Sequence, residues 1–391
     1  MRLAIVASHP IQYYAPWFQR VGAEPGFDLK VFYLWDFGVT EQRDKGFKRS
    51  IRWDLPLLDG YAHEFVENTS RDPGTHHFWG IRNPRLPAKV REFQPDAVLL
   101  YGYNYATHQR LIWTWNRSRA PLLFRGDSHR LVARHGPREW LRRRWIRSAF
   151  ERFGAFLPVG QANRDYFRYH GVPEERLFFA PHAVDNDRFA GAPDETQPAA
   201  AQWRAELGIS DGQRVVLFAG KLQSKKRPDD LMTAFLRLER DDVTLLFVGD
   251  GEMESALRAK AAGHPRIVFA PFQNQTAMPR TYAAAHLFVL PSFGHDETWG
   301  LAVNEAMCLG KPIIVSSHVG CAQDLVESGG NGLVFPAGDV DALTAALREA
   351  LSDPERLARW GQRSREIISG YTYARGVEGL KQACQALGVD R

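Results

Sequence analysis

Two doubly wound, Rossmann-like α/β domains are the fold class that this sequence predicts. Short apolar runs bounded by Gly, Pro or Asp recur along the chain, and stretches long enough for a helix separate most of them. Such alternation is typical of parallel strands joined by crossover helices. The length of 391 residues favours two such domains rather than one. Ligands of these sheets bind beyond the carboxyl ends of the strands, so the residues after each run are candidates for a site.

The apolar runs fall into two series along the chain. The first series lies at 3–8, 29–35, 97–102, 121–126, 155–160 and 177–182, and the second at 214–220, 243–249, 266–272, 286–292, 311–317 and 332–338. We therefore predict an N-terminal domain over 1–190 and a C-terminal domain over 202–370. A linker at 191–201, rich in Pro, Ala and acids, joins them.

Composition disfavours several protein classes. The longest apolar runs are far shorter than the roughly 20 residues that span a bilayer. The first residues carry no basic leader before an apolar segment, so we expect no secretory signal. Cys308, Cys321 and Cys384 form neither a disulfide framework nor a C-x-x-C zinc pair. We expect a cytoplasmic protein.

The segment after the run at 286–292 carries the most informative motif. Glu297 and Glu305 are separated by seven residues, and Gly300 between them permits a close backbone approach. LAVNEAMCLG predicts a helix, and free N–H groups near 299–302 would attract a phosphate. Glu305 can accept hydrogen bonds from ribose hydroxyls, and Glu297 can hold sugar hydroxyls. In the alternative, Glu305 only stabilises the positive end of its helix and Glu297 is a solvated loop acid.

Basic residues follow the first run of the second series. Lys221 comes directly after Gly220, and Lys226 lies five residues further on. Two ammonium groups at this strand end would neutralise a diphosphate without a divalent metal. An exposed basic loop is the alternative, and for Lys225 and Arg227 it is as plausible as a site.

The N-terminal half offers candidates for acceptor binding. His9 follows the first run, Tyr103 follows the run at 97–102, and Arg125, Asp127 and His129 gather around the end of the run at 121–126. Asp127 would accept the proton of an acceptor hydroxyl, and His129 would orient that hydroxyl. The alternatives are helix capping for Asp127 or His129, a strand-to-helix turn at His9 and aromatic packing for Tyr103.

Taken in order and spacing, the C-terminal motifs resemble the donor-binding domain of family 4 retaining glycosyltransferases with the GT-B fold. The motifs are GKL-x3-K, VGDGE (248–252), E-x7-E, GKPIIVSS and NGLVFPAGD, and the opening SHPIQYYAPWFQ (8–19) is similar to the start of one subgroup of that family. The resemblance implies two domains facing each other across a cleft. It also implies a hexosyltransferase that moves a sugar from a nucleotide diphosphate sugar to an acceptor hydroxyl, with retained anomeric configuration and without metal or cofactor. The sequence departs from the family at Lys221, where Arg is common, and at Asn304, where an apolar residue or proline is commoner.

The same resemblance implies roles for individual residues. Lys221 and Lys226 would bind the diphosphate and assist its departure, Glu297 would bind the donor sugar, and a helix at 371–391 would cross back to the first domain. The resemblance also implies that Glu305 binds the ribose and that Phe272, Gln273 and Asn274 hold the base. From their positions at strand ends and at the helix start, we further predict donor binding by Gly220, Thr298, Trp299, Gly300, Leu301 and Ala302, and acceptor binding by His9, Tyr103 and Arg125.

An arginine-rich segment suggests a membrane surface as a partner. Eight arginines between Arg130 and Arg152 face only two acids, and over 137–156 apolar residues such as Trp140 and Trp145 recur at helical spacing. A basic amphipathic helix with tryptophans is suited to anionic lipid at the inner face of the plasma membrane. Packing of the apolar stripe onto the domain is the alternative. The other partners we expect are a nucleotide-sugar donor and a glycan or lipid-linked acceptor, but no nucleic acid.

Two other protein classes fit parts of the sequence. A nucleotide-sugar epimerase shares the two-domain architecture but acts without an acceptor. A nucleic-acid-binding protein would explain the arginines, yet it leaves Glu297 and Glu305 unexplained. The D-x-D string at Asp185–Asp187 is interpreted as a turn or hinge element rather than a metal site.

Overall fold

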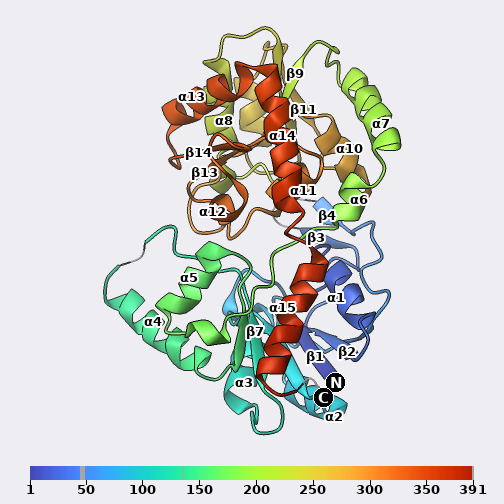
Figure 1. The fold of residues 1–391 in the computed structure, drawn as a ribbon, viewed down its shortest axis with the longest axis vertical. Helices are drawn as coiled ribbons and strands as arrows, with labels where there is room; N and C mark the ends of the chain where they lie inside the picture. The colour runs from blue at the N-terminus through green and yellow to red at the C-terminus, as the bar shows by residue number, and fades with distance from the viewer. Residues whose placement is uncertain (45–48, 134, 390–391) are drawn as a thin grey trace. The chain divides into compact units, whose positions relative to one another are not determined.

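The computed structural model describes residues 1–44, 49–133 and 135–389 and divides into two compact units (Figure 1). The first unit contains Met1–Gln42, Leu55–His182 and Tyr373–Arg391, and the second contains Arg43–Asp54 and Ala183–Thr372. The chain therefore passes between the units at 42/43, 54/55, 182/183 and 372/373. The predicted linker and the predicted return of the chain at 371 account for two passages, and the other two enclose Arg43–Asp54.

A six-stranded parallel sheet forms the centre of the first unit. Its strands are β1 (Arg2–Ala7), β2 (Asp28–Tyr33), β5 (Ala62–Phe65), β6 (Ala97–Tyr101), β7 (Leu122–Arg125) and β8 (Ala155–Leu157). Their order across the sheet is β5-β2-β1-β6-β7-β8. The chain thus builds outward from β1 in one direction and then in the other, which places a switch point between β1 and β6.

Burial of both sheet faces explains why these strands are continuously apolar. In β1, Ala4 and Val6 belong to one buried cluster, whereas Leu3, Ile5 and Ala7 belong to another. Successive side chains of a strand point to opposite faces, so both faces of β1 are covered by other elements. A strand buried in this way shows no alternation of polar and apolar residues.

The second unit repeats the same topology. Its strands are β9 (Arg214–Ala219), β10 (Val243–Val248), β11 (Ile267–Ala270), β12 (Leu287–Leu290), β13 (Ile313–Ser316) and β14 (Gly332–Phe335). They form a parallel sheet of order β11-β10-β9-β12-β13-β14. Leu287 pairs with Val216 and Phe288 with Leu217, so β9 and β12 are neighbours at the switch point and their carboxyl ends meet at one edge.

Helices connect the strands in both units. In the first unit these are α1 (Ala15–Gly22), α2 (Leu86–Phe93), α3 (Ala106–Thr114), α4 (Pro137–Phe150), α5 (Gln161–Tyr169) and α15 (Tyr373–Ala386), with short 3-10 turns η1 (Phe78–Gly80) and η2 (Glu174–Arg176). In the second unit they are α6 (Asn186–Ala190), α7 (Pro193–Glu206), α8 (Pro228–Leu236), α9 (Glu254–Lys260), α10 (Met278–Ala283), α11 (Leu301–Cys308), α12 (Ala322–Leu325), α13 (Val340–Leu351) and α14 (Pro354–Ile368), with η3 (Ser224–Lys226) and η4 (Gln275–Ala277). A two-stranded sheet pairs β3 (Gln42–Asp44) with β4 (Arg49–Ile51).

Helix α15 returns the chain to the first unit after the second is complete. It packs on α1 and β8, although more than 200 residues separate it from either. Leu380, Ala383 and Cys384 of α15 join the buried cluster that contains Leu3 and Ile5 of β1. The C-terminal helix is therefore part of the core of the first unit.

Two predicted segments differ in the structure. The segment 191–201, predicted as a linker, lies largely within helix α7, which begins at Pro193 and has Asp194 and Glu195 in its first turn. Proline at the first position, acids in the first turn and a run of alanines all favour a helix. The segment 177–182, predicted as a strand, follows β8 and the residues after it with three backbone hydrogen bonds, but it forms only an isolated bridge and not a strand.

Candidate functional site

Glycines bring the ends of β9 and β10 into close contact. A Cβ on Gly249 would lie 2.2 Å from the carbonyl oxygen of Gly220, and one on Gly251 would lie 2.3 Å from the oxygen of Leu222. Gly249 also has a positive φ of 132°. Only glycine permits this approach. Lys221 is the half-buried residue between Gly220 and the buried Leu222, so its backbone is fixed on both sides.

Lys226 and Glu297 form a direct ion pair at the switch point. Lys226 ends η3 after β9, and its Nζ donates to Oε2 of Glu297, which follows β12. Oγ of Ser292 donates to the same Oε2 over 2.8 Å. Only 12% of the Glu297 side chain and 21% of the Lys226 side chain is exposed. An ammonium and a carboxylate are thus held side by side and are still reachable from solvent.

The loop that carries Glu297 is anchored at both ends. The N–H of Phe293 donates to the carbonyl of Lys225 over 2.8 Å, which ties the start of the loop to η3. The N–H of Gly320 donates to the carbonyl of Glu297 over 3.0 Å, and the N–H of Cys321 to that of Trp299 over 2.9 Å. The position of Glu297 is therefore set by the neighbouring backbone.

Helix α11 begins directly after this loop and carries Glu305. Gly300 adopts a φ of 95°, a left-handed conformation that turns the chain into the helix. Leu301 and Ala302 form the first turn. Glu305 is 2% exposed, and its Oε2 accepts a hydrogen bond of 2.7 Å from the hydroxyl of Tyr282 on α10.

Asn304 braces the turn that precedes the helix. It is fully buried, and its Oδ1 accepts a hydrogen bond of 2.8 Å from the indole Nε1 of Trp299. Trp299 is itself 3% exposed. An apolar residue at 304 would leave this buried indole N–H without its acceptor. Asn304 thus has a structural role in this chain.

The loop after β11 is held from two directions. The N–H of Phe272 donates to Oδ1 of Asp250 over 3.1 Å, and the Gln273 side chain accepts a hydrogen bond of 2.9 Å from Arg280. The Nδ2 of Asn274 donates to the carbonyl of Arg52 over 2.9 Å. Arg52 belongs to the segment Arg43–Asp54, which the second unit includes although the residues on either side belong to the first.

Trp53 and Asp54 of this segment also contact the loop after β11. The rings of Trp53 and Phe272 lie 6.3 Å apart, and the carboxylate of Asp54 accepts hydrogen bonds from both the N–H and the hydroxyl of Thr276. The segment 52–54 therefore packs on the loop predicted to hold the nucleotide base. Sequence reasoning missed it because nothing local in 43–54 indicates where it docks.

In the first unit, Asp127 pairs with a histidine that sequence reasoning missed. The Oδ2 of Asp127 lies 3.6 Å from Nε2 of His182, whose ring stacks on Tyr14 at a centroid distance of 6.0 Å. Burial lowers the pKa of His182, although Asp127 acts in the opposite direction. Burial raises the pKa of the Tyr14 hydroxyl, and Asp127 raises it further. The available signal was the position of His182 at the end of the apolar run 177–182.

Arg125 and Tyr103 have partners within the unit. The two terminal nitrogens of Arg125 donate to the carbonyls of Ala180 and Pro181 over 2.7 and 3.1 Å, and the residue is 5% exposed. The Tyr103 hydroxyl lies 2.6 Å from that of Tyr166, and Tyr103 is 6% exposed. Both contacts organise the carboxyl edge of the sheet.

His9 and His129 are half-buried at the same edge. The Nδ1 of His9 lies 3.0 Å from the hydroxyl of Ser8, and its ring contacts Trp35 and Phe37. The Nδ1 of His129 accepts a hydrogen bond of 3.3 Å from the N–H of Leu131. His129 thus stabilises its own turn through one nitrogen.

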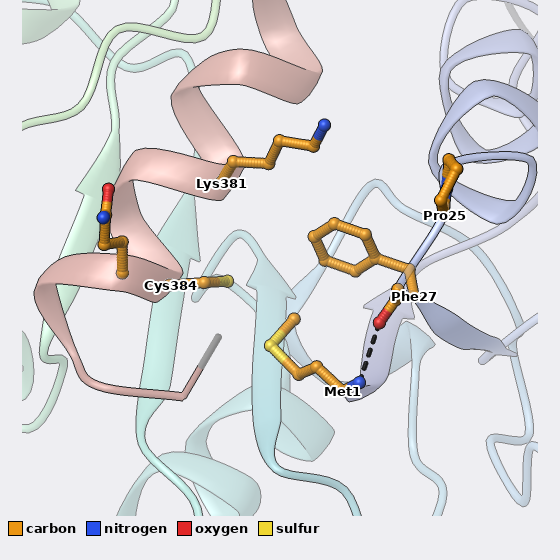
Figure 2. A pocket seen from close by; sticks show the side chains of 7 residues that line it. Met1, Pro25, Phe27, Lys381 and Cys384 are labelled. Atoms are coloured by element: carbon orange, nitrogen blue, oxygen red, sulfur yellow. Dashed lines mark hydrogen bonds between the residues drawn. The ribbon is translucent and has the colours of Figure 1, made fainter. Parts of the chain in front are cut away.

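A pocket of about 270 Å³ lies elsewhere in the first unit (Figure 2). It is lined by Met1, Pro25, Gly26, Phe27, Lys381, Cys384 and Gln385, where α15 meets the start of β1 and the turn before β2. The amino group of Met1 donates to the carbonyl of Gly26 over 2.7 Å. None of the predicted site residues lines this pocket.

Helix α4 has one buried and one exposed apolar face. Ile146, Ala149 and Phe150 are buried, whereas Trp140, Leu141 and Trp145 are 61, 59 and 41% exposed. Arg138, Arg143, Arg144 and Arg147 are exposed on the same helix, and Arg134 of the basic segment lies outside the described residues. Among the described residues, no helix has both the length and the apolar character needed to cross a membrane.

Both sheets share the doubly wound order, and the predicted GT-B fold class is confirmed by solved glycosyltransferases of the same fold. Anabaena HepE, solved in complex with UDP, superposes with a TM-score of 0.73 over 98% of this chain and 100% of its own. The two sequences are 19% identical, so this similarity concerns the fold.

The proteins that are similar in sequence are also glycosyltransferases. Residues 200–367 match the family described as Glycosyl transferases group 1. A D-inositol 3-phosphate glycosyltransferase from Nocardia farcinica is 30% identical over 236 residues, which are 57% of this chain and 50% of that protein. A GDP-mannose-dependent alpha-(1-6)-phosphatidylinositol monomannoside mannosyltransferase from Mycolicibacterium smegmatis is 32% identical over 257 residues, 62% of this chain and 66% of that protein. The chain thus spans about half the length of the first relative.

Proposed function

We propose that the protein is a retaining glycosyltransferase of family 4, in the SHPIQY-type subgroup, that transfers a sugar from a nucleotide diphosphate sugar to an acceptor hydroxyl. One observation carries this proposal: the ammonium of Lys226 is paired with the carboxylate of Glu297 where the carboxyl ends of β9 and β12 meet. A switch point of this kind is where doubly wound sheets bind nucleotides. The match of residues 200–367 to a glycosyltransferase family supports the same conclusion.

The second unit binds the donor in this proposal. The diphosphate lies against Lys221, Lys226 and the N-terminal N–H groups of α11, so the negative charge that grows on the leaving nucleotide is stabilised by positive groups already in place. No divalent metal is required, because the two ammonium groups supply the countercharge. Glu297 accepts hydrogen bonds from the sugar, and Glu305 accepts them from the ribose.

The loop Phe272–Asn274 receives the nucleotide base. The packing of segment 52–54 on this loop supports a fixed base subsite, because it holds Asn274 and Thr276 in one conformation. GDP-mannose appears in the name of one relative, and HepE has been solved with UDP-glucose. These two donors are therefore the first to test.

The acceptor is bound by the first unit. Asp127 takes the proton of the attacking hydroxyl, and His182 positions the carboxylate from 3.6 Å away. Because the pKa of His182 is lowered, the imidazole is neutral at pH 7 and can donate one hydrogen bond without adding charge. His9, Tyr103, Arg125 and His129 shape the surrounding edge of the sheet.

The acceptor is a lipid-linked or cell-surface glycan precursor. The enzyme works in the cytoplasm at an anionic membrane. The relative from Mycolicibacterium smegmatis is named for a phosphatidylinositol monomannoside acceptor. Helix α4 presents Trp140, Leu141 and Trp145 next to exposed arginines, and this combination favours anionic lipid surfaces.

A donor panel tests the proposal. The protein is melted in the presence of UDP-glucose, GDP-mannose and an ADP-sugar, and then incubated with each of them plus candidate glycolipid acceptors without added metal. We expect one donor to raise the melting temperature, because ligands that bind the folded state stabilise it. We also expect the transferred sugar to keep its anomeric configuration. Sugar isomerisation without an acceptor, or no effect of any donor, would reject the proposal.

A further inference from the structure

The loop between β5 and α2 gathers three groups that commonly bind transition metals. Asp72, His76 and His77 each offer one ligand atom, and these atoms lie within 4.8 Å of one another. The Nε2 of His76 lies 3.0 Å, and the Nε2 of His77 3.4 Å, from the same Oδ2 of Asp72. We propose that these three residues form a binding site for a divalent transition-metal ion of the zinc type.

The spacing of the donor atoms fits such an ion. Zinc binds imidazole nitrogen and carboxylate oxygen at about 2.0–2.2 Å, so neighbouring ligand atoms on a tetrahedron lie about 3.4 Å apart. The two histidine-to-aspartate distances of 3.0 and 3.4 Å lie close to this value.

The donor set also selects the metal. Two imidazoles and one carboxylate suit Zn²⁺, Cu²⁺ or Ni²⁺, whereas Mg²⁺ and Ca²⁺ prefer oxygen ligands throughout. Asp72 and His76 are exposed and His77 is half-buried, so an ion can enter directly from solvent. Three protein ligands leave at least one coordination position for water.

The loop is held in shape before any ion binds. The side chain of Asn68 donates to the carbonyl of Gly80 over 2.9 Å and accepts from the N–H of Arg82 over 2.9 Å. The N–H of Gly74 donates to Gly80, and the N–H of Gly80 to the carbonyl of His77. A Cβ on Gly80 would lie 2.1 Å from the oxygen of Gly74, so this closure requires glycine. A preformed loop lowers the entropy cost of binding.

The proposed metal site and the proposed donor site use different residues. Asp72, His76 and His77 belong to the first unit, whereas Lys226, Glu297 and Glu305 belong to the second. The metal proposal therefore does not depend on the proposed function, and its test needs no measurement of transfer.

Titration with Zn²⁺ tests this site. The chain is prepared without a polyhistidine tag and freed of metal, and binding is measured by calorimetry and by competition with a chromophoric chelator. We expect one equivalent to bind, and His76→Ala and His77→Ala each to weaken binding by about 100-fold, since loss of even an outer-shell partner costs roughly 10–100-fold. His135→Ala, at an exposed histidine outside the cluster, is the matched control and should bind like the wild type.

Melting curves distinguish a variant that has lost a metal-binding side chain from one that no longer folds. Zn²⁺ should raise the melting temperature of the wild type, a chelator should reverse the rise, and neither should affect a folded His76→Ala variant. If the alanine variants do not fold, the isosteric Asp72→Asn variant takes their place. A wild type that takes up no Zn²⁺, or a folded His76→Ala variant that binds it equally well, would overturn the proposal.

Discussion

Lys225 and Lys226 are adjacent in the sequence but lie in different environments. Lys226 is half-buried against Glu297, whereas Lys225 is exposed, and its ammonium lies 3.7 Å from the carboxylate of Asp296. From the sequence, the two ammonium groups could not be distinguished by residue type. The fold separates them because η3 turns one side chain toward the switch point and leaves the other in solvent.

This pair gives a matched test of donor binding. Lys226→Ala should lower kcat/KM for the donor by about 100-fold, the scale on which one group that stabilises transition-state charge acts. Lys225→Ala should stay within about twofold, because exposed ion pairs contribute little. The measurement is steady-state transfer with a saturating acceptor. Equal losses in the two variants would contradict the assignment of Lys226.

A second residue-scale prediction concerns His108 in α3. It is 1% exposed, neither ring nitrogen has a hydrogen-bond partner among the described residues, and burial lowers its pKa to about 3. The unfolded chain takes up a proton below about pH 6.5, whereas the folded chain does not until about pH 3. The contribution of neutral His108 to the free energy of unfolding is therefore complete above pH 6.5. It declines as the pH falls toward 3, by up to about 1.4 kcal/mol per pH unit.

His108→Leu should make the stability less dependent on pH. Melting temperatures of the variant and the wild type are compared between pH 7.5 and 4.5, and the difference should shift in favour of the variant as the pH falls. His135→Leu, at an exposed histidine, should leave the pH dependence unchanged. A difference between His108→Leu and wild type that is constant with pH would contradict the lowered pKa of His108, because it would mean that His108 binds its proton equally in the folded and unfolded chain.

Among the elements, the strand ends decide the geometry of the site. The apolar runs predicted β9 and β12, but their adjacency follows from the sheet order, in which β10 and β11 extend to one side of β9. In that order, η3, which follows β9, lies beside the loop that follows β12. The close approach of Gly220 and Gly249 then sets the distance between the turns that follow β9 and β10.

Gly249→Ala tests this element-scale contact. The new Cβ would lie 2.2 Å from the Gly220 oxygen, at a φ of 132° that alanine rarely adopts, so we expect a loss of about 2 kcal/mol or more in the free energy of unfolding and weaker donor binding. Gly212→Ala is the control, because its Cβ meets nothing within 4 Å. Chemical denaturation and donor-induced thermal shifts provide the two measurements. Equal stability of the two variants would contradict the role given to Gly249.

At the scale of the whole molecule, the chain leaves each unit and returns to it. Segment 43–54 belongs to the second unit and helix α15 to the first, so neither unit is one continuous stretch of sequence. The predicted boundaries at 190 and 202 come from composition, and the prediction included the return of the chain at 371 but not the passages at 42/43 and 54/55. The structure places a boundary at 182/183 and turns the predicted linker into α7, which packs on α10.

The proposed membrane association concerns the whole molecule, and helix α4 allows a test of it. Replacement of both Trp140 and Trp145 by Ala should abolish flotation of the protein with anionic liposomes, because the variant loses the exposed apolar face while its arginines remain. Trp113→Ala removes a tryptophan of similar exposure from α3 and is the control. Retained flotation of the double variant, or none by the wild type, would contradict a membrane role for α4.

The sequence by itself determined the two parallel sheets, because strands buried on both faces must be continuously apolar, and it determined the residues that follow each strand. It missed β5, a short edge strand with polar residues, since its pattern AHEF resembles a loop. Contacts between distant segments were decided only by the tertiary structure: Asp127 with His182, Glu305 with Tyr282, and segment 52–54 with the loop after β11. The physical reason is that local patterns report the burial of a segment, whereas its partner is chosen by packing that no short stretch of sequence records.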